Sequence, residues 1–201
     1  MNDSTVNILN LCDEILLIIF NKLNKIDVLY ALIGANRKLD SFARDTIFTG
    51  SVDLVTISLN EVNDSRNKTI FDRFCFDIVP RIHHNIESLT LDPLSIDRID
   101  RIENYFKLHK LTLMNLQLEM ASRIFNDESS FIHTFKHQIS HLTVTIHDDS
   151  TGEHVQKLST NVFTKIFIMF INLTYFHYHL QDICRHVPNS LINLPSTTCY
   201  S

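Results

Sequence analysis

The order of apolar and polar residues divides the chain into two parts with different periodicity. In the first part, apolar residues recur at the spacing of one helical face, at Leu11, Ile15, Leu16, Ile19, Phe20 and Leu23. Asp13 and Glu14 stand at the start of this stretch, where the helix dipole favours negative charge. The pattern predicts an amphipathic helix.

Two shorter helical patterns follow the first one. Asp27 is a suitable N-cap for a second helix over the apolar positions 28–32, and a third helix is predicted over 37–43. Three short helices within so few residues cannot enclose a large core. Some of their apolar surface is therefore expected to meet a partner.

After Gly50 the pattern changes to a short motif, apolar-x-x-apolar-x-apolar, that recurs five times. Each copy alternates apolar and polar positions as a strand does, and the middle positions lie about 22 to 34 residues apart. The copies are Leu54, Ile57 and Leu59; Ile86, Leu89 and Leu91; Leu108, Leu111 and Leu113; Ile139, Leu142 and Val144; and Leu173, Phe176 and Tyr178.

Segments with helical periodicity lie between these copies. Apolar stripes predict helices over 70–82, 96–106 and 155–170, and either one kinked helix or two short ones over 116–135. Strands and helices that alternate with short connections form a parallel sheet with helices on one side. The second part of the chain is therefore predicted to be an α/β unit.

The C-terminal stretch after Tyr178 has no clear final helix and contains Pro188 and Pro195. A stacked array needs a cap over its last apolar face. Two alternatives stay open. Either the array is truncated, or the cap is formed by Ile183, Val187, Leu191 and Leu194.

Charge and composition argue against two classes of ligand. The chain has a formal net charge of −5 and no stripe of lysine or arginine, so nucleic-acid binding is not expected. Its three glycines, Gly34, Gly50 and Gly152, stand far apart. Loops that cradle phosphates need clustered glycines, so a nucleotide cofactor is not expected either.

The sequence also indicates a compartment. Its N-terminus lacks the positive segment and apolar run of a secretory signal, and the apolar stretch 162–180 is too polar for a membrane span. The cysteines Cys12, Cys75, Cys184 and Cys199 are scattered and form no Cys-x-x-Cys pair. We therefore expect reduced thiols and a cytoplasmic or nuclear location, without membrane attachment.

Catalytic and metal chemistry find little support in the sequence. His133, His137 and His141 are spaced like ligands on one helical face, but the glutamate of a zinc-protease helix is missing after His133. Cys75 and Cys184 have apolar neighbours, which is typical of core thiols. No nucleophile elbow or paired carboxylates are present. We expect no enzyme, no metal and no cofactor.

The N-terminal stretch resembles an F-box. That family has the pattern Leu-Pro-x-Glu-Ile-Leu, then Ile-Phe-x-x-Leu, an Asp that opens the next helix, and an Arg-x-hydrophobic segment ending in Ala-x-Asp. The chain matches it at Leu11, Glu14, Ile15, Leu16, Ile19, Phe20, Leu23, Asp27, Arg37, Leu39, Ala43 and Asp45. Cys12 replaces the helix-opening proline, and Leu39 stands where tryptophan is common. We expect weaker helix initiation and a retained fold.

The second part resembles the irregular leucine-rich-repeat solenoid that follows many F-boxes. The Asn or Cys that usually follows each strand in that family is seldom present, with Asn115 as one instance. A small α/β domain of another kind would also alternate strands and helices. The predicted fold is mainly α with α/β, with a three-helix F-box over 8–50 and a short leucine-rich-repeat-like solenoid with a small parallel sheet over 51–201.

The resemblance implies that the chain is the substrate-receptor subunit of a Skp–cullin–F-box ubiquitin ligase. It would dock on a Skp-type adaptor, reach a cullin through it, and present its repeats to a target protein. The residues matched to the adaptor interface are Leu11, Ile15, Leu16, Ile19, Phe20, Leu23 and Val28. Two alternatives are an interaction module whose F-box no longer recruits a ligase, and a metal-binding protein that uses the His133 group.

Overall fold

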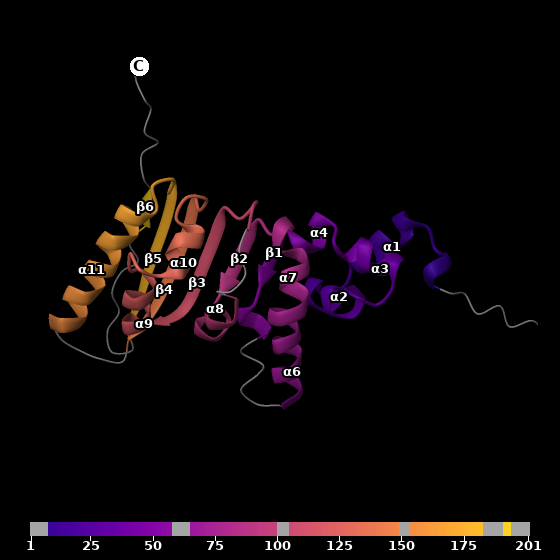
Figure 1. Ribbon diagram of the computed structural model, residues 1–201, viewed down its shortest axis with the longest axis horizontal. Helices are drawn as coiled ribbons and strands as arrows, with labels where there is room; N and C mark the ends of the chain where they lie inside the picture. The colour runs from indigo at the N-terminus through magenta and orange to yellow at the C-terminus, as the bar shows by residue number, and fades with distance from the viewer. Residues whose placement is uncertain (1–7, 58–64, 100–104, 149–152, 183–190, 194–201) are drawn as a thin grey trace, which may run out of the picture. The chain divides into compact units, whose positions relative to one another are not determined.

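The computed structural model describes residues 8–57, 65–99, 105–148, 153–182 and 191–193. It divides into two compact units, Met1–Gly50 and Ser51–Ser201, which we call the N-terminal and C-terminal units. Figure 1 labels their helices and strands. The fold is mixed α/β and includes a small parallel five-stranded sheet.

The N-terminal unit is made of short helices that begin at side-chain caps. Its elements are a 3₁₀ turn, Ile8–Asn10, and the helices α1, Asp13–Phe20, α2, Lys25–Leu32, α3, Arg37–Ala43, and α4, Thr46–Thr49. The three predicted helices are confirmed, and α4 is an addition. Asn24 caps α2 by accepting a hydrogen bond from the backbone N–H of Ile26 at 2.9 Å. The predicted cap, Asp27, is therefore wrong, because it lies inside the first turn of α2.

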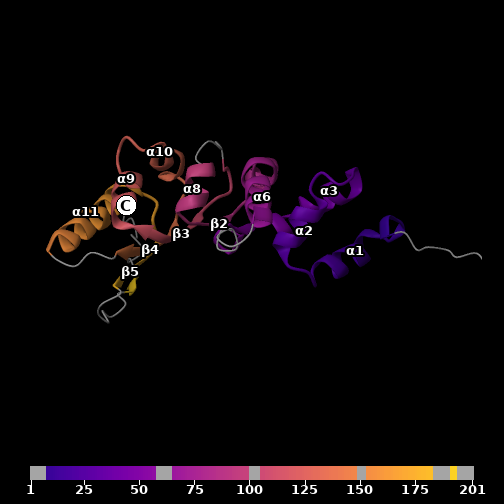
Figure 2. The ribbon, with the colours of Figure 1, turned by 90° about the horizontal axis from the view of Figure 1, so that it is seen from below.

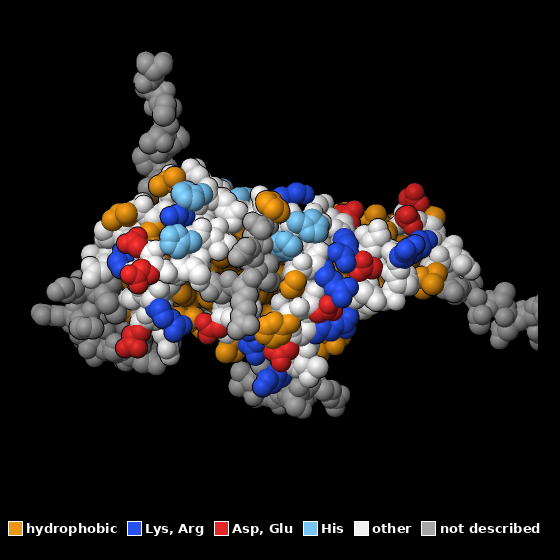
Figure 3. Space-filling view, viewed as in Figure 1, with side chains coloured by type: hydrophobic (Ala, Val, Ile, Leu, Met, Phe, Trp, Pro, Cys, Tyr) orange, Lys and Arg blue, Asp and Glu red, His pale blue; other side chains and the backbone are white. Residues whose placement is uncertain are grey.

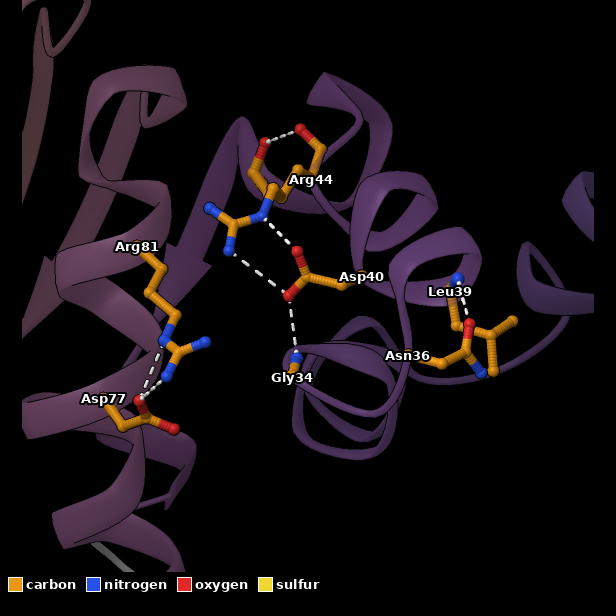
Figure 4. A network of polar contacts seen from close by, with 8 residues as sticks. Gly34, Asn36, Leu39, Asp40, Arg44, Asp77 and Arg81 are labelled. Carbon is orange, nitrogen blue, oxygen red and sulfur yellow. Dashed lines mark hydrogen bonds and ion pairs between the residues drawn. The ribbon is translucent and has the colours of Figure 1, made fainter.

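A small core and one carboxylate hold these helices together. Leu16, Leu29 and Ile33 are fully buried. Asp40 of α3 accepts a hydrogen bond from the backbone N–H of Gly34 at 2.7 Å and binds Arg44 through Nε at 2.7 Å (Figure 4). Gly34 has a φ of 79°, a conformation that glycine adopts without strain. Asp40 thus fixes the turn that joins α2 to α3.

The C-terminal unit is built on a six-stranded sheet in sequential order. Its strands are β1, Ser51–Asp53, β2, Ser88–Leu91, β3, Lys110–Gln117, β4, His141–Asp148, β5, Tyr175–Asp182, and β6, Leu191–Asn193. The first five are parallel, and β6 pairs antiparallel with β5. Leu191 therefore extends the sheet as the first residue of β6, whereas Ile183, Val187 and Leu194 lie outside the described residues.

Helices lie on one side of this sheet, as Figure 2 shows. They are α6, Ser65–Arg73, α7, Val79–Ile82, α8, Pro93–Ile99, α9, Leu118–Ile124, α10, Ser130–Phe135, and α11, Glu153–Met169. A π-helical turn, Phe74–Ile78, joins α6 to α7 just before Pro80, which has no N–H for the helical ladder. The segment 116–135 thus contains two short helices rather than one kinked helix.

The strand register confirms four of the five motif copies. Leu89, Leu111, Leu142 and Phe176 are register partners on neighbouring strands, and each is buried beneath the helices. The first copy is wrong. Val52 pairs with Leu89, whereas Ile57 lies in a helical turn after β1. The strand ends early because the Asp53 carboxylate accepts a hydrogen bond from the backbone N–H of Val55 at 2.9 Å.

Two further expectations need correction. Asn115 has a φ of 56° at an irregularity in the pairing of β3 with β4, and its side chain is exposed. It marks a bulge and is not a buried asparagine that follows a strand. The helix predicted to reach Phe106 is described as far as Ile99, and Tyr105 and Phe106 are not helical. Phe106 is 74% exposed. Tyr105 is buried there instead, and this burial raises its pKa.

Candidate interaction surfaces

Helix α1 exposes a row of aliphatic side chains. Ile15, Ile18 and Ile19 follow the i, i+3, i+4 spacing of one helical face, and Leu23 comes one turn later along the chain. Their exposed fractions are 43%, 59%, 37% and 53% respectively. We call these four residues the α1 ridge. Burying isoleucine and leucine side chains away from water lowers the free energy, so this ridge is suited to a hydrophobic partner.

The structure separates the seven predicted interface residues into two groups. Ile15, Ile19 and Leu23 are exposed and belong to the α1 ridge, and Leu11 is half-buried. Leu16, Phe20 and Val28 are buried in the unit's own core and are removed from the predicted interface. The reason is the helical period, because Leu16 and Phe20 lie on the side of α1 opposite Ile18.

Ile18 is a ridge residue that the sequence analysis missed. The signal was the uninterrupted apolar run from Ile15 to Phe20. A helix of eight residues that packs on one side can bury only part of such a run. The apolar residue that fits neither side of a strict amphipathic pattern is the one to expect on the surface.

The start of α1 is held by Lys38 of α3. Its ammonium donates hydrogen bonds to the backbone carbonyls of Leu11 at 2.7 Å and Leu9 at 3.1 Å, and lies 3.4 Å from the Asp13 carboxylate. These contacts tie the chain before α1 to α3. They do not replace an N-cap, because the side chain of Cys12 makes no capping hydrogen bond to the helix backbone. Hydrogen bonds from its own backbone N–H and from the Cys12 thiol lower the pKa of Glu14.

The side of the sheet away from the helices is polar. Here Lys110, His141 and Tyr175 are register partners on β3, β4 and β5, and Thr112, Thr143 and His177 form the next row. All six are exposed or half-buried. We call the residues that β3, β4 and β5 present on this side the open strand face. It supplies hydroxyl and imidazole groups but no aliphatic row like the α1 ridge.

The structure distributes the predicted metal ligands over several elements. His133 lies in α10, His137 follows this helix, and His141 is the first residue of β4. Figure 3, which views the helix-covered side, shows histidines over α10 and near α7. Within the described ranges, no three His, Cys, Asp or Glu side chains gather closely enough to hold a metal ion. Cys75 is buried, and Cys184 lies outside those ranges.

Residues of α8, α9 and α10 line a hollow in the C-terminal unit. Asp97, Arg123 and Glu128 are among its lining residues, and Arg123 Nη2 lies 3.8 Å from Asp97 Oδ1. Both of these side chains are about 70% exposed, so the pair is weak. The hollow contains no histidine or cysteine that would suggest chemistry.

No helix in the part of the chain that the structure describes is long and apolar enough to cross a membrane.

Comparisons with protein-family models, with curated proteins and with solved structures find no match to this chain.

Proposed function

We propose that this chain is the substrate-receptor subunit of a Skp–cullin–F-box ubiquitin ligase. The N-terminal unit docks on a Skp-type adaptor through the α1 ridge, and the adaptor links it to a cullin. The C-terminal unit binds a target protein. Catalysis belongs to other subunits of the ligase.

The α1 ridge is the observation that carries this proposal. The N-terminal unit has only 50 residues, and it leaves Ile15, Ile18, Ile19 and Leu23 substantially exposed. Fully burying one such side chain contributes about 1.5 to 3 kcal/mol, and these four are already partly covered. A partner that covered all four would still gain several kcal/mol, enough for the centre of a stable interface.

The order of helices supports the same proposal. Most of the F-box-like motif positions fall on α1, α2 and α3, whereas Leu11, Leu23 and Asp45 lie just outside these helices. Ile15 and Ile19 are on the ridge, and Leu16 and Phe20 are in the core. One stretch of sequence therefore supplies both a core and a docking face. Cys12, at the N-cap of α1, departs from the family without removing the helix.

The C-terminal unit supports a receptor role by its repetition. Four motif copies form neighbouring parallel strands in register, so equivalent positions of each copy line up across the open strand face. Stacked repeats commonly use such extended surfaces for binding. The exposed Asn115 departs from the leucine-rich-repeat pattern, which makes this the less specific half of the resemblance.

Co-expression with a Skp-type adaptor, followed by size-exclusion chromatography, tests the proposal. The wild type should co-elute with the adaptor, whereas Ile18→Asp should lose roughly a hundredfold or more in affinity, because a carboxylate would be buried without a partner. Ile18 is 59% exposed, so the free protein should keep its stability within about 0.5 kcal/mol.

Ile168→Asp is the matched control, because Ile168 is 70% exposed on α11 of the C-terminal unit. It should co-elute as the wild type does. If neither the wild type nor the control binds the adaptor while both stay folded and monomeric, the ligase role is wrong. The chain would then be an interaction module whose F-box-like unit has another partner.

A further inference from the structure

The open strand face carries an unusual set of charges for an acidic chain. On β3, β4 and β5 its exposed or half-buried residues include Lys110, Thr112, Met114, Gln117, His141, Thr143, His147, Tyr175, His177 and His179, whereas Thr145 on the same side is buried against Met114. None of them is acidic, although the whole chain has a net charge of −5. One lysine and four imidazoles thus lie on one surface with threonine hydroxyls between them.

Three rings lie in a file at the start of this face. The imidazoles of His109, just before β3, and His141 have centroids 6.2 Å apart, and His141 stacks on Tyr175 at 5.8 Å. Backbone bonds set this spacing, because the carbonyl of His109 accepts hydrogen bonds from the backbone N–H groups of Ser140 and His141, each at 2.9 Å. The Ser140 hydroxyl lies 2.9 Å from Nδ1 of His141 and orients its ring.

One exposed acidic residue lies beside the start of this face: Glu87, just before β2, whose backbone carbonyl accepts hydrogen bonds from the N–H groups of His109 and Lys110, each at 3.1 Å. The next acidic residue on this side is further away. Asp53 occupies the equivalent side of β1, three strands away from β4 in the sheet order. Its carboxylate already accepts hydrogen bonds from Val55 and from the Thr56 hydroxyl. The titratable groups beside the imidazoles are Glu87 before β2, Lys110 and His109 on the β3 side, and Tyr175 on β5. The β6 partners of β5 are Asn193, Ile192 and Leu191.

We infer that the open strand face binds an acidic segment of a partner protein, and that binding strengthens as the pH falls. Imidazoles gain positive charge within the range of about pH 5 to 8, and the threonine hydroxyls can donate hydrogen bonds to carboxylates. The inference rests on the proposed role of the C-terminal unit as a target receptor and names the chemistry of its target.

A protein partner fits this face better than a nucleic acid. Nucleic-acid sites neutralise several phosphates with lysine or arginine, and the described part of this face offers one lysine. Imidazoles that are only partly charged near neutral pH suit a weaker and adjustable attraction to carboxylates.

Fluorescence anisotropy with the full chain tests the inference. The probe is a labelled peptide of alternating glutamate and serine, compared with the same peptide carrying glutamine for glutamate. Affinity for the glutamate peptide should rise about threefold to tenfold between about pH 8 and about pH 6, because each exposed charge pair contributes little alone. The glutamine peptide should show no such rise.

Paired variants locate the site. His141→Gln with His177→Gln should remove most of the pH-dependent gain. His133→Gln with His137→Gln, which removes two exposed imidazoles outside this face, should keep it. Circular dichroism checks that both proteins are folded. If both pairs lose the gain equally, if affinity does not change with pH, or if a labelled oligouridine binds more tightly than the peptide, the inference is wrong.

The same variants separate this inference from the proposed ligase role. His141→Gln with His177→Gln should still co-elute with the Skp-type adaptor, because neither residue belongs to the N-terminal unit. A failure of peptide binding with intact adaptor binding would overturn the inference alone. The converse result would overturn the ligase role and leave an acidic-peptide module.

Discussion

The N-terminal unit exposes aliphatic side chains in a continuous row on α1, whereas the C-terminal unit presents a polar sheet face and buries its aliphatic rows under helices. The comparison is clearest between Ile18, which is 59% exposed, and Leu111, which is fully buried. Both belong to regular apolar patterns in the sequence. The difference arises because β3 has a strand on each side and helices above it, while α1 meets its own unit on one side only.

An apolar pattern therefore predicts burial only where enough helices and strands surround it. The C-terminal unit exposes apolar residues too, such as Ile168 and Ile171 near the end of α11. Others are Phe76, Leu94 and Phe106, so the exposed apolar residues of this unit are scattered over several elements. The α1 ridge instead combines three residues of one helical face with Leu23 after it, which is why we assign docking to the N-terminal unit.

The largest expected effect comes from the buried side of the sheet. Phe176 lies beneath α11, with its ring 5.1 Å from Phe167 and 5.5 Å from Phe163. Phe176→Ala should lower the free energy of unfolding by about 3 to 5 kcal/mol, because it leaves a cavity in a packed core. Urea denaturation measures this change, with Ile168→Ala as an exposed control that should cost less than about 1 kcal/mol. Equal effects would contradict the comparison.

The second prediction compares the stability contribution of an aspartate–arginine ion pair in each unit, and a loss of intermediate size is expected. Asp40→Ala removes the Arg44 pair and the bond to the Gly34 N–H, from a side chain that is 23% exposed. It should cost about 1 to 3 kcal/mol. Asp77→Ala removes the pairs with Arg81 and Arg73, where the Asp77 side chain is 41% exposed, and should cost less than about 1 kcal/mol.

Thermal unfolding of these two variants checks this ranking. Figure 4 labels each carboxylate with its partners, Asp40 with Gly34 and Arg44, and Asp77 with Arg81. If Asp77→Ala is the more destabilising variant, then the turn between α2 and α3 does not depend on Asp40. The hydrogen bond and ion pair of Asp40 would then not be the main polar contacts that hold the N-terminal unit together.

The smallest expected effect is a gain in the N-terminal unit. Cys12 has the extended φ and ψ of an N-cap residue, −68° and 158°, but its thiol makes no capping hydrogen bond to the helix backbone. Cys12→Ser should raise the free energy of unfolding by about 0.5 to 1 kcal/mol, since a hydroxyl at the N-cap accepts a bond from the helix backbone. Cys12→Ala is the control and should show no such gain in a chemical-denaturation series.

Much of the C-terminal unit could be predicted because strands and helices have different periods. The alternation around Leu89, Leu111, Leu142 and Phe176 identified four strands and their order. The prediction for the first copy was wrong because the apolar pattern continues to Ile57, whereas the strand itself ends at a local hydrogen bond. The Asp53 carboxylate ends β1 and starts a turn, and apolar spacing alone does not reveal that competition.

The candidate sites were predicted less completely. The sequence identified α1 as the helix with excess apolar surface, but it assigned Leu16, Phe20 and Val28 to the interface and omitted Ile18. The sequence predicted that the repeats bind a target, but among the histidines on the open strand face it suggested His141 as a possible metal ligand. Their common face follows from the register of β4 with β5, which relates residues more than thirty positions apart.

The periods within the sequence predicted most of the helices, four of the five strand motifs and the division of the chain after Gly50. These choices depend on residues within a few positions of one another, whose backbone and side-chain preferences act locally. Only the tertiary structure decided which apolar residues remain exposed on α1 and which imidazoles meet across β3, β4 and β5. The exposure of a side chain and the register of a strand depend on the residues packed against them, and those residues are distant in the sequence.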